Sequence, residues 1–204
     1  MFATNLDREL EERLIKERRA AGADRYDEVW DGVYVMSPMP NVEHQRFVGK
    51  LNTVFEIAVD WAGLGEAFPG VNVSDRRDDW TKNYRCPDVA VFLNNTAAEN
   101  HGSFWYGGPD FAIEIISDDD RTRDKFDFYA KVNTRELLIV DRDPWVLELY
   151  RLTDGELQLV GTSTPVSSLV LSSEIVPLSF CLKTGTQRPV IEIRHNDGRQ
   201  KWRV

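Results

Sequence analysis

Two apolar stretches decide how this chain folds: Pro87-Asp88-Val89-Ala90-Val91-Phe92-Leu93 and Phe111-Ala112-Ile113-Glu114-Ile115-Ile116-Ser117. Each is a nearly continuous apolar run, which is typical of a central strand covered on both faces. Asp88 opens the first run, and Glu114 lies within the second. The 26 positions that separate them (114 − 88) leave enough chain to bring the two strands side by side. Both carboxylates can then point at one place.

These two carboxylates and a nearby lysine suggest a chemistry. Magnesium prefers oxygen ligands and keeps several waters, so two carboxylates suffice as protein ligands. Hydrolysis of a phosphodiester needs a bound metal, an activated water and neutralisation of charge near the leaving group. Lys125 lies just beyond the strand that carries Glu114, where an ammonium group can stabilise that charge. Asp88, Glu114 and Lys125 together predict a metal-dependent nuclease.

Each of these residues also has a simpler interpretation. Side chains alternate along a strand, so Glu114 shares a face with Ala112 and Ile116. A glutamate there is costly to bury unpaired and needs a metal, a cation or a proton. A structural ion pair with an arginine would meet that need equally well. Lys125, with Tyr129 four residues later on the same helix face, would otherwise be an ordinary exposed lysine.

The rest of the chain reads as alternating helices and strands. Apolar periodicity, caps and turns predict helices over about 5–20, 43–61 and 121–132, and further strands over about 26–30, 33–36, 67–73, 137–141, 146–152, 156–160, 175–182 and 190–194. Cap residues stand before each helix: Thr4 or Asn5, then Asn41, then Asp118 to Asp120. The Asp31-Gly32 dipeptide is a strong hairpin signal, and residues 94–108 read as a loop. An α/β fold is the simplest account.

Composition limits the class of protein. The chain has 204 residues, of which 42% are hydrophobic, and this suits one domain over residues 1–204 with a substantial core. No apolar run is long enough to cross a bilayer, and the charged N-terminus does not resemble a secretory signal. Cys86 and Cys181 are too few and too far apart for a disulfide framework or a zinc site. A reduced, cytoplasmic protein is the expectation.

The net charge of −9 counts against nucleic-acid binding, for which a basic surface is expected. A carboxylate-rich active site is acidic before it binds metal, however, and positive charge can be local. Two basic clusters occur, namely Arg76, Arg77, Lys82 and Arg85, and then Arg121, Arg123, Lys125 and Lys131. Both clusters also fit an ordinary solvated surface. The acidic balance therefore favours the competing hypothesis of a non-catalytic binding module.

Seven stretches of the chain, in this order and spacing, resemble a known family. They are Glu28-Val29-Trp30-Asp31-Gly32, Met36-Ser37-Pro38, His44-Gln45, Pro87-Asp88-Val89, Glu114-Ile115-Ile116-Ser117, Arg123-Asp124-Lys125 with Tyr129, and Glu136-Leu137-Leu138-Ile139-Val140-Asp141. The chain resembles the Uma-type endonucleases of bacteria, a branch of the PD-(D/E)XK restriction-endonuclease-like superfamily. The resemblance covers a core of about residues 26–152.

The resemblance implies a fold and a site. The fold would be a restriction-endonuclease-like mixed central sheet flanked by helices, with an N-terminal helix and β-hairpin. Asp88 and Glu114 would bind the metal, and the backbone carbonyl of Ile115 would complete the site. The superfamily's lysine normally stands two residues after the glutamate, where this chain has Ile116. In similar members a lysine on the following helix takes the place of the superfamily's lysine, and Lys125 matches that residue. Such a change of position is possible because a long side chain can reach one target from different backbone positions.

Two further residues match the family. Glu28 precedes the Asp-Gly hairpin and would assist by holding a second cation or orienting water; otherwise it would be a strand-edge glutamate facing solvent. His44 begins the long helix and would position phosphate or water, unless it only caps or packs. The family commonly has Gly-Val after the lysine helix, where this chain has Asn133-Thr134. Asn tolerates the left-handed conformation, so the turn is expected to be kept.

The sequence therefore predicts an endonuclease that depends on Mg²⁺ or Mn²⁺ and hydrolyses phosphodiester bonds in DNA. The alternative is a nuclease-like binding or interaction module without catalysis. A homodimer is a further expectation, with the apolar strands from Leu137 to Tyr150 and Trp145 at the interface. No membrane partner is expected.

Overall fold

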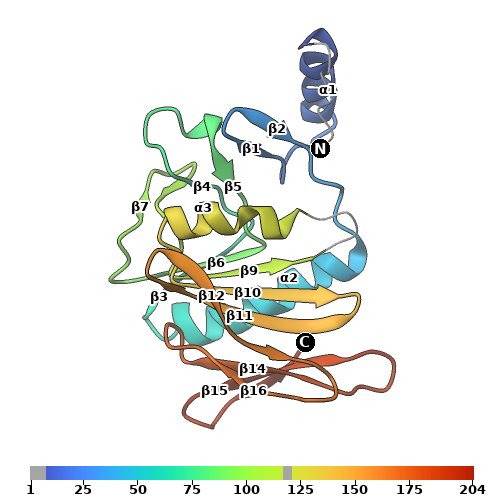
Figure 1. Cartoon of the computed structure of the whole chain (residues 1–204), viewed down its shortest axis with the longest axis vertical. Coiled ribbons are helices and arrows are strands. Elements are labelled where there is room, and N and C mark those ends of the chain that lie inside the picture. Colours follow the sequence, from blue (N-terminus) through green and yellow to red (C-terminus); the bar gives the residue numbers. More distant parts are fainter. Residues whose placement is uncertain (1–7, 117–120) are drawn as a thin grey trace.

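The structure, a computed structural model, describes residues 8–116 and 121–204 (Figure 1). Its helices are α1 Arg8–Ala20, α2 Val42–Phe55 and α3 Phe126–Lys131, and its shorter turns are the π-helical η1 Glu56–Asp60 and the 3₁₀-helical η2 Trp80–Lys82 and η3 Thr122–Lys125. The strands of the described residues form three sheets. Within this part of the chain, no helix has the length and apolarity needed to span a membrane.

The central sheet contains both of the apolar stretches that opened the sequence analysis. Its six strands lie in the order β12-β11-β10-β9-β6-β3. Their bounds are β3 Gly65–Pro69, β6 Val89–Leu93, β9 Phe111–Ile115, β10 Glu136–Arg142, β11 Trp145–Thr153 and β12 Glu156–Ser163. β9 and β10 run parallel, and every other neighbouring pair is antiparallel. The predicted adjacency of the two stretches is confirmed, since Ala90 on β6 pairs with Ala112 on β9.

The two faces of the central sheet carry separate hydrophobic cores. One core joins α2 to Val89, Val91 and Ile113 and to the C-terminal strands. The other joins α3 to Ala90, Ala112 and the aromatic side chains around them. Alternation along β9 therefore puts Glu114 on the same face as Ala112, toward α3. Figure 1 shows α2 and α3 on opposite faces of the sheet.

A third sheet covers the α2 face. It is formed by β13 Leu171–Ser172, β14 Leu178–Lys183, β15 Val190–His195 and β16 Lys201–Arg203. Phe55 at the end of α2 links the layers, because its ring lies 5.3 Å from that of Phe111 on β9 and 6.2 Å from that of Phe180 on β14. The sequence predicted two strands in this tail, and both exist with shifted bounds.

The second sheet is built from short strands that wrap the α3 side. It runs β2-β1-β5-β4-β8-β7, with bounds β1 Glu28–Trp30, β2 Val33–Val35, β4 Val73–Ser74, β5 Tyr84–Arg85, β7 Glu99–Asn100 and β8 Trp105–Tyr106. The predicted hairpin is confirmed, since Asp31 and Gly32 turn it with φ of 48° and 86°. The turn expected after α3 is also present, since Asn133 adopts the left-handed conformation with a φ of 65°.

Several predicted elements were wrong in extent. The strand predicted over 67–73 ends at Pro69, because Gly70 turns the chain with a φ of 62° and β4 then joins another sheet. The predicted loop over 94–108 contains β7 and β8. The long helix is α2 followed by η1, and Asn41 caps it as predicted by accepting a hydrogen bond from His44 N at 2.8 Å.

Two predictions about caps fall outside the described residues. Thr4 and Asn5 precede the described part of α1, which ends at Ala20 as expected. Asp118 to Asp120 likewise precede the described turn η3, which takes up the first part of the helix predicted over 121–132.

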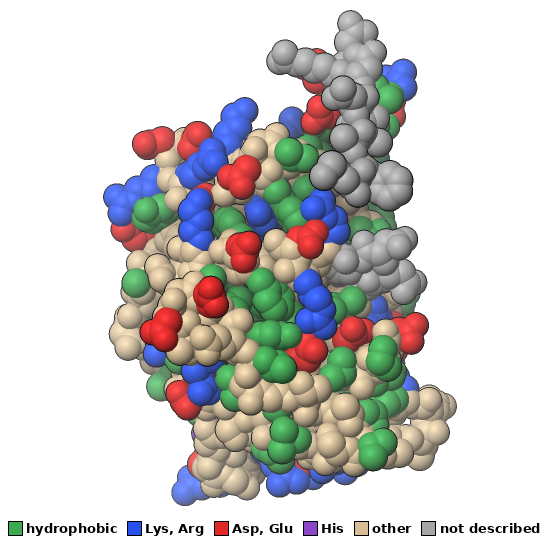
Figure 2. All heavy atoms as spheres, in the orientation of Figure 1, with side chains coloured by type: hydrophobic (Ala, Val, Ile, Leu, Met, Phe, Trp, Pro, Cys, Tyr) green, Lys and Arg blue, Asp and Glu red, His purple; other side chains and the backbone are tan. Residues whose placement is uncertain are grey.

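Part of the expected dimer surface lies in the core, whereas Trp145 and Tyr150 stay partly exposed, so the homodimer remains a prediction. The side chains of Leu137 to Val140 on β10 are fully buried inside the chain, because β10 is covered on both faces by the two cores. They fill the core and are not available to a second copy. Figure 2 shows how charged and hydrophobic side chains intermix on one outer face of the molecule.

The three-layer contact at Phe55 gives a test of this packing. Phe55 is fully buried, so Phe55→Ala should lower the free energy of unfolding by about 3–5 kcal/mol through lost burial and a cavity. Val166→Ala is the matched control, because Val166 is 96% exposed and such a change should stay within about 0.5 kcal/mol. Urea unfolding followed by circular dichroism measures both. Equal midpoints for the two variants would contradict the proposed role of Phe55.

Candidate active site

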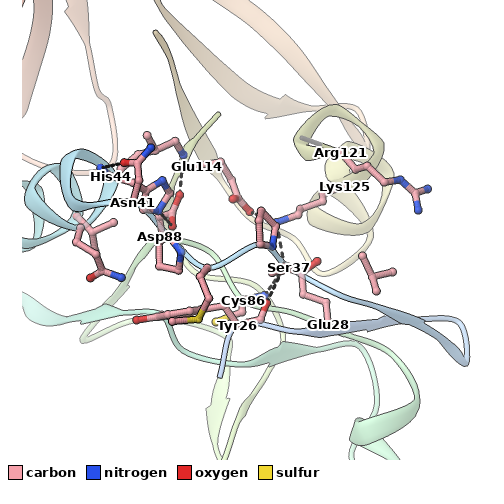
Figure 3. Close-up of a pocket in the computed structure, with 18 of the residues that line it drawn as sticks. Tyr26, Glu28, Ser37, Asn41, His44, Cys86, Asp88, Glu114, Arg121 and Lys125 are labelled. Atoms are coloured by element: carbon pink, nitrogen blue, oxygen red, sulfur yellow. Dashed lines mark hydrogen bonds and ion pairs between the residues drawn. The ribbon is translucent and has the colours of Figure 1, made fainter. Parts of the chain in front are cut away.

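A cavity of about 320 Å³ opens between the central sheet, the hairpin β1–β2 and the start of α2. The predicted site residues all line it: Glu28, His44, Asp88, Glu114, Ile115 and Lys125. Figure 3 shows the side chains of Glu28, His44, Asp88, Glu114 and Lys125 arriving from different elements, with Asp88 beside His44 and with Glu114 and Lys125 facing each other. Residues up to 97 positions apart (125 − 28) thus meet at one place.

Lys125 lies between two glutamates. Its Nζ is 2.9 Å from Oε1 of Glu28 and 3.0 Å from Oε1 of Glu114. The side chain is 12% exposed, which excludes the interpretation as an ordinary surface lysine. Burial by itself lowers the pKa of this ammonium group, but the charges of Glu114 and Glu28 outweigh it and leave the pKa raised. Lys125 is therefore held as a cation.

Glu114 projects from β9 into the space below η3 and α3. Its Oε1 accepts hydrogen bonds from Lys125 Nζ and from the hydroxyl of Tyr129. Burial, followed by the charges of Asp88 and Glu28, raises the pKa of Glu114 to about 8, although the charge of Lys125 acts to lower it. The partner of Glu114 is thus Lys125 and not the arginine that the alternative interpretation required.

Glu28 is buried at the inner edge of β1. Its Oε1 accepts the backbone N–H of Cys86 at 2.8 Å, and its Oε2 accepts the indole N–H of Trp30 at 2.6 Å. The side chain is only 3% exposed, so the interpretation as a solvent-facing strand-edge residue is wrong. These contacts hold the carboxylate that faces Lys125.

Asp88 stands directly before β6, beside the end of β9. Its Oδ2 accepts the backbone N–H of Ile115 at 2.7 Å, and its Oδ1 lies 2.8 Å from Nε2 of His44. The N–H and C=O of one strand residue face the same side of the strand. The carbonyl of Ile115 is therefore directed to the same side as Asp88.

Other lining residues were not singled out as site residues from the sequence. Arg121 lies over the ring of Trp30, with 4.4 Å from Cζ to the ring centroid. Arg142, the last residue of β10, lies 3.1 Å from Glu43 and donates to the carbonyl of Ile116 at 3.3 Å. In the sequence, Arg142 directly follows the strand predicted over 137–141. This position at a strand end was the one feature that could have identified Arg142 as a site residue.

The donor chemistry of the cavity fits a hard divalent cation. It offers carboxylate oxygens from Asp88, Glu114 and Glu28 and the backbone carbonyl of Ile115, which are the oxygen ligands that Mg²⁺ prefers. The raised pKa of Glu114 comes first from burial, with the charges of Asp88 and Glu28 as smaller contributions. Over residues 8–116 and 121–204, no group of three or more His, Cys, Asp or Glu side chains is gathered closely enough to hold a metal ion by itself.

The raised pKa of Glu114 predicts a pH dependence of stability. The folded state binds a proton at Glu114 up to about pH 8, whereas the unfolded state releases it near the ordinary value of 4.5. The stability from this proton is full below pH 4.5 and is lost as the pH rises to about 8. Lys125 stays charged throughout this range, since its pKa is raised from 10.5.

Urea unfolding in the presence of a chelator, at several values between about pH 5 and 8, tests this prediction. Glu114→Gln cannot ionise, so its free energy of unfolding should fall less over this range than that of the unchanged protein. Glu156→Gln, at an exposed position on β12, should keep the full decline. Parallel pH profiles for all three proteins would contradict the assignment to Glu114.

Comparisons with known proteins bear on the fold and the family of the chain. A crystal structure described as a putative nuclease belonging to DUF820, from Anabaena variabilis ATCC 29413, is similar with a TM-score of 0.55 and 21% sequence identity, covering 72% of this chain and 80% of that chain. This likeness supports the restriction-endonuclease-like α/β fold. No curated protein matches the chain. The model of the Uma2 family, described as "putative restriction endonuclease", matches residues 12–184, and the chain belongs to this family.

Proposed function

We propose that this protein is a metal-dependent endonuclease that hydrolyses phosphodiester bonds in DNA. One observation carries the proposal: Lys125 is buried between Glu28 and Glu114 in the cavity that also contains Asp88. Burial of several charged groups in one cavity is unfavourable unless they are paired, and such groups cluster at functional sites. Membership of the Uma2 family supports a nuclease role.

Asp88 and Glu114 would hold Mg²⁺ or Mn²⁺ together with the carbonyl of Ile115. The cation would act as a Lewis acid on the phosphate and would lower the pKa of a bound water. Lys125 would place its positive charge beside the phosphoryl group, where negative charge grows during hydrolysis. Glu28 would keep the ammonium group in position through its 2.9 Å contact.

The acidic chain needs local positive charge to bind DNA. Three cationic side chains line the cavity, those of Arg121, Lys125 and Arg142. Arg121 is paired with Asp124 and Arg142 with Glu43, so both arginines lie at the cavity with only one carboxylate partner each among the described residues. Phosphate oxygens can accept from the remaining N–H groups of a guanidinium. This arrangement supports DNA as the substrate despite the net charge of −9.

A non-catalytic binding module is the second candidate. It is favoured by the contacts of Glu114, because Lys125 and Tyr129 both donate to its Oε1 without a metal ion. A structural ion pair of this kind would hold α3 to β9 and perform no chemistry. Calorimetric titration with Mn²⁺ separates the two candidates, since only the nuclease requires a cation at Asp88 and Glu114.

The nuclease proposal predicts the behaviour of two variants. Asp88→Ala and Lys125→Ala should each abolish Mg²⁺-dependent cleavage of plasmid DNA, because the first removes a cation ligand and the second removes the charge beside the phosphate. Losses of about 10²-fold or more are expected for groups that stabilise a developing charge. A gel assay with supercoiled plasmid measures nicked and linear products.

Matched controls keep this test specific. Asp78→Ala and Lys16→Ala remove the same charges at exposed positions outside the cavity and should cleave as the unchanged protein does. Thermal melting checks that each variant is folded. Full cleavage by either Asp88→Ala or Lys125→Ala would refute the assigned roles, and absence of Mn²⁺ binding by the unchanged protein would favour the binding module.

A further inference from the structure

We propose that His44 is a positioning residue, which fixes the Asp88 carboxylate in the orientation that binds the cation. This inference rests on the proposed function, since it concerns how the same site is prepared for a metal ion. The sequence left His44 between a role toward phosphate or water and a simple capping or packing role. The contacts of its ring lead to a different assignment.

Both oxygens of Asp88 are held from outside its own strand. Ile115 N–H reaches Oδ2 at 2.7 Å, and His44 Nε2 lies 2.8 Å from Oδ1. A carboxylate can only accept hydrogen bonds, so His44 donates through Nε2–H when Asp88 is ionised. Each carboxylate oxygen offers two lone-pair directions, so the described residues leave one on each oxygen for a cation.

The backbone of His44 is fixed by the start of α2. Asn41 caps the helix, because its Oδ1 accepts a hydrogen bond from the backbone N–H of His44 at 2.8 Å. This cap places His44 in the first turn of α2, beside β6. The cap itself uses the backbone of His44 and leaves its ring free. The ring is largely buried at 12% exposure and reaches across to Asp88, 44 residues along the chain. A capping role therefore does not account for the imidazole.

A packing role does not account for it either. Nδ1 of His44 is buried without a hydrogen-bond partner among the described residues. Burial of an unsatisfied polar atom is unfavourable, and an apolar side chain of similar size would avoid it. The histidine ring has this unfavourable buried Nδ1 atom, and its other nitrogen contacts Asp88. The contact of Nε2 is thus the property that distinguishes histidine from an apolar residue at this position.

Asp88 needs such support because of its surroundings. Glu28 lies in the same cavity, as does Glu114, and the like charge of each ionised glutamate pushes the carboxylate of Asp88 away. Asp88 is also 18% exposed, so a rotation into solvent is open to it. The hydrogen bonds from His44 and Ile115 oppose this rotation. Groups that orient a metal ligand in this way commonly change metal affinity or activity by about 10–100-fold when they are removed.

The test compares three substitutions at His44 by calorimetric titration of the folded, full-length protein with Mn²⁺. His44→Ala removes the donor and should weaken Mn²⁺ binding by about 10–100-fold. His44→Asn keeps an N–H group on a shorter side chain and should also bind weakly. His44→Gln carries its N–H group further out and should recover binding to within a few-fold of the unchanged protein. His101→Ala, at an exposed histidine outside the cavity, is the control and should bind normally.

Cleavage kinetics give a second readout. His44→Ala should lower kcat at saturating DNA and raise the Mn²⁺ concentration needed for half-maximal cleavage, with little change in the KM for DNA. His44→Gln should reverse both effects. A role in general packing would lower the melting temperature of all three variants without this separation of Gln from Ala and Asn.

Asp88→Ala distinguishes failure of this inference from failure of the proposed function. If Asp88→Ala loses Mn²⁺ binding while His44→Ala binds as the unchanged protein does, the positioning role is overturned and the metal site stands. If Asp88→Ala binds Mn²⁺ normally, both the metal site and the positioning role are overturned. Equal weakening by the Ala, Asn and Gln substitutions would also overturn the specific role of the Nε2 donor.

Discussion

The buried ion pairs of Lys125 with Glu28 and Glu114 are the interaction on which the site depends. They join η3, the hairpin strand β1 and the central strand β9, three elements from distant parts of the chain. Removing Lys125 would leave the two buried glutamates without their cationic partner, which is strongly destabilising. The same three side chains face a cavity, so the interaction that organises the fold locally also defines its candidate chemistry.

The two cores of the molecule have different tasks. The core on the α2 face is apolar throughout and joins the central sheet to the third sheet through Phe55, Phe111 and Phe180. The core on the α3 face changes from apolar at Ala112 to charged at Glu114 within two residues of β9. This change occurs at the end of the strand, where β6 begins and α2 starts. The rigid apolar part thus supports a polar rim that contains the functional groups.

Much of the site could be predicted from residue types and spacing, because short-range rules act on them. Alternation put Glu114 on the face of Ala112, and the Asn41 cap and the Asp31-Gly32 turn followed from their side chains and backbone freedom. The break after Pro69 was missed, since a run of apolar residues does not show where a chain leaves one sheet for another. Arg121 and Arg142 were missed as site residues for a related reason: Arg121 lies over Trp30 and Arg142 donates to the carbonyl of Ile116, and both contacts connect elements that are distant in sequence.

By itself, the sequence determined the α/β class, the two central strands and the set of acids and lysine, since these depend on periodicity and local chemistry. Only the tertiary structure decided what those groups do to one another. Lys125 could have faced solvent and Glu28 could have been a strand-edge residue; instead each is buried against the other. His44 could have only capped a helix, and it contacts Asp88. Burial, pairing and the pKa of Glu114 arise from charges brought together across the fold, and no local pattern encodes those distances.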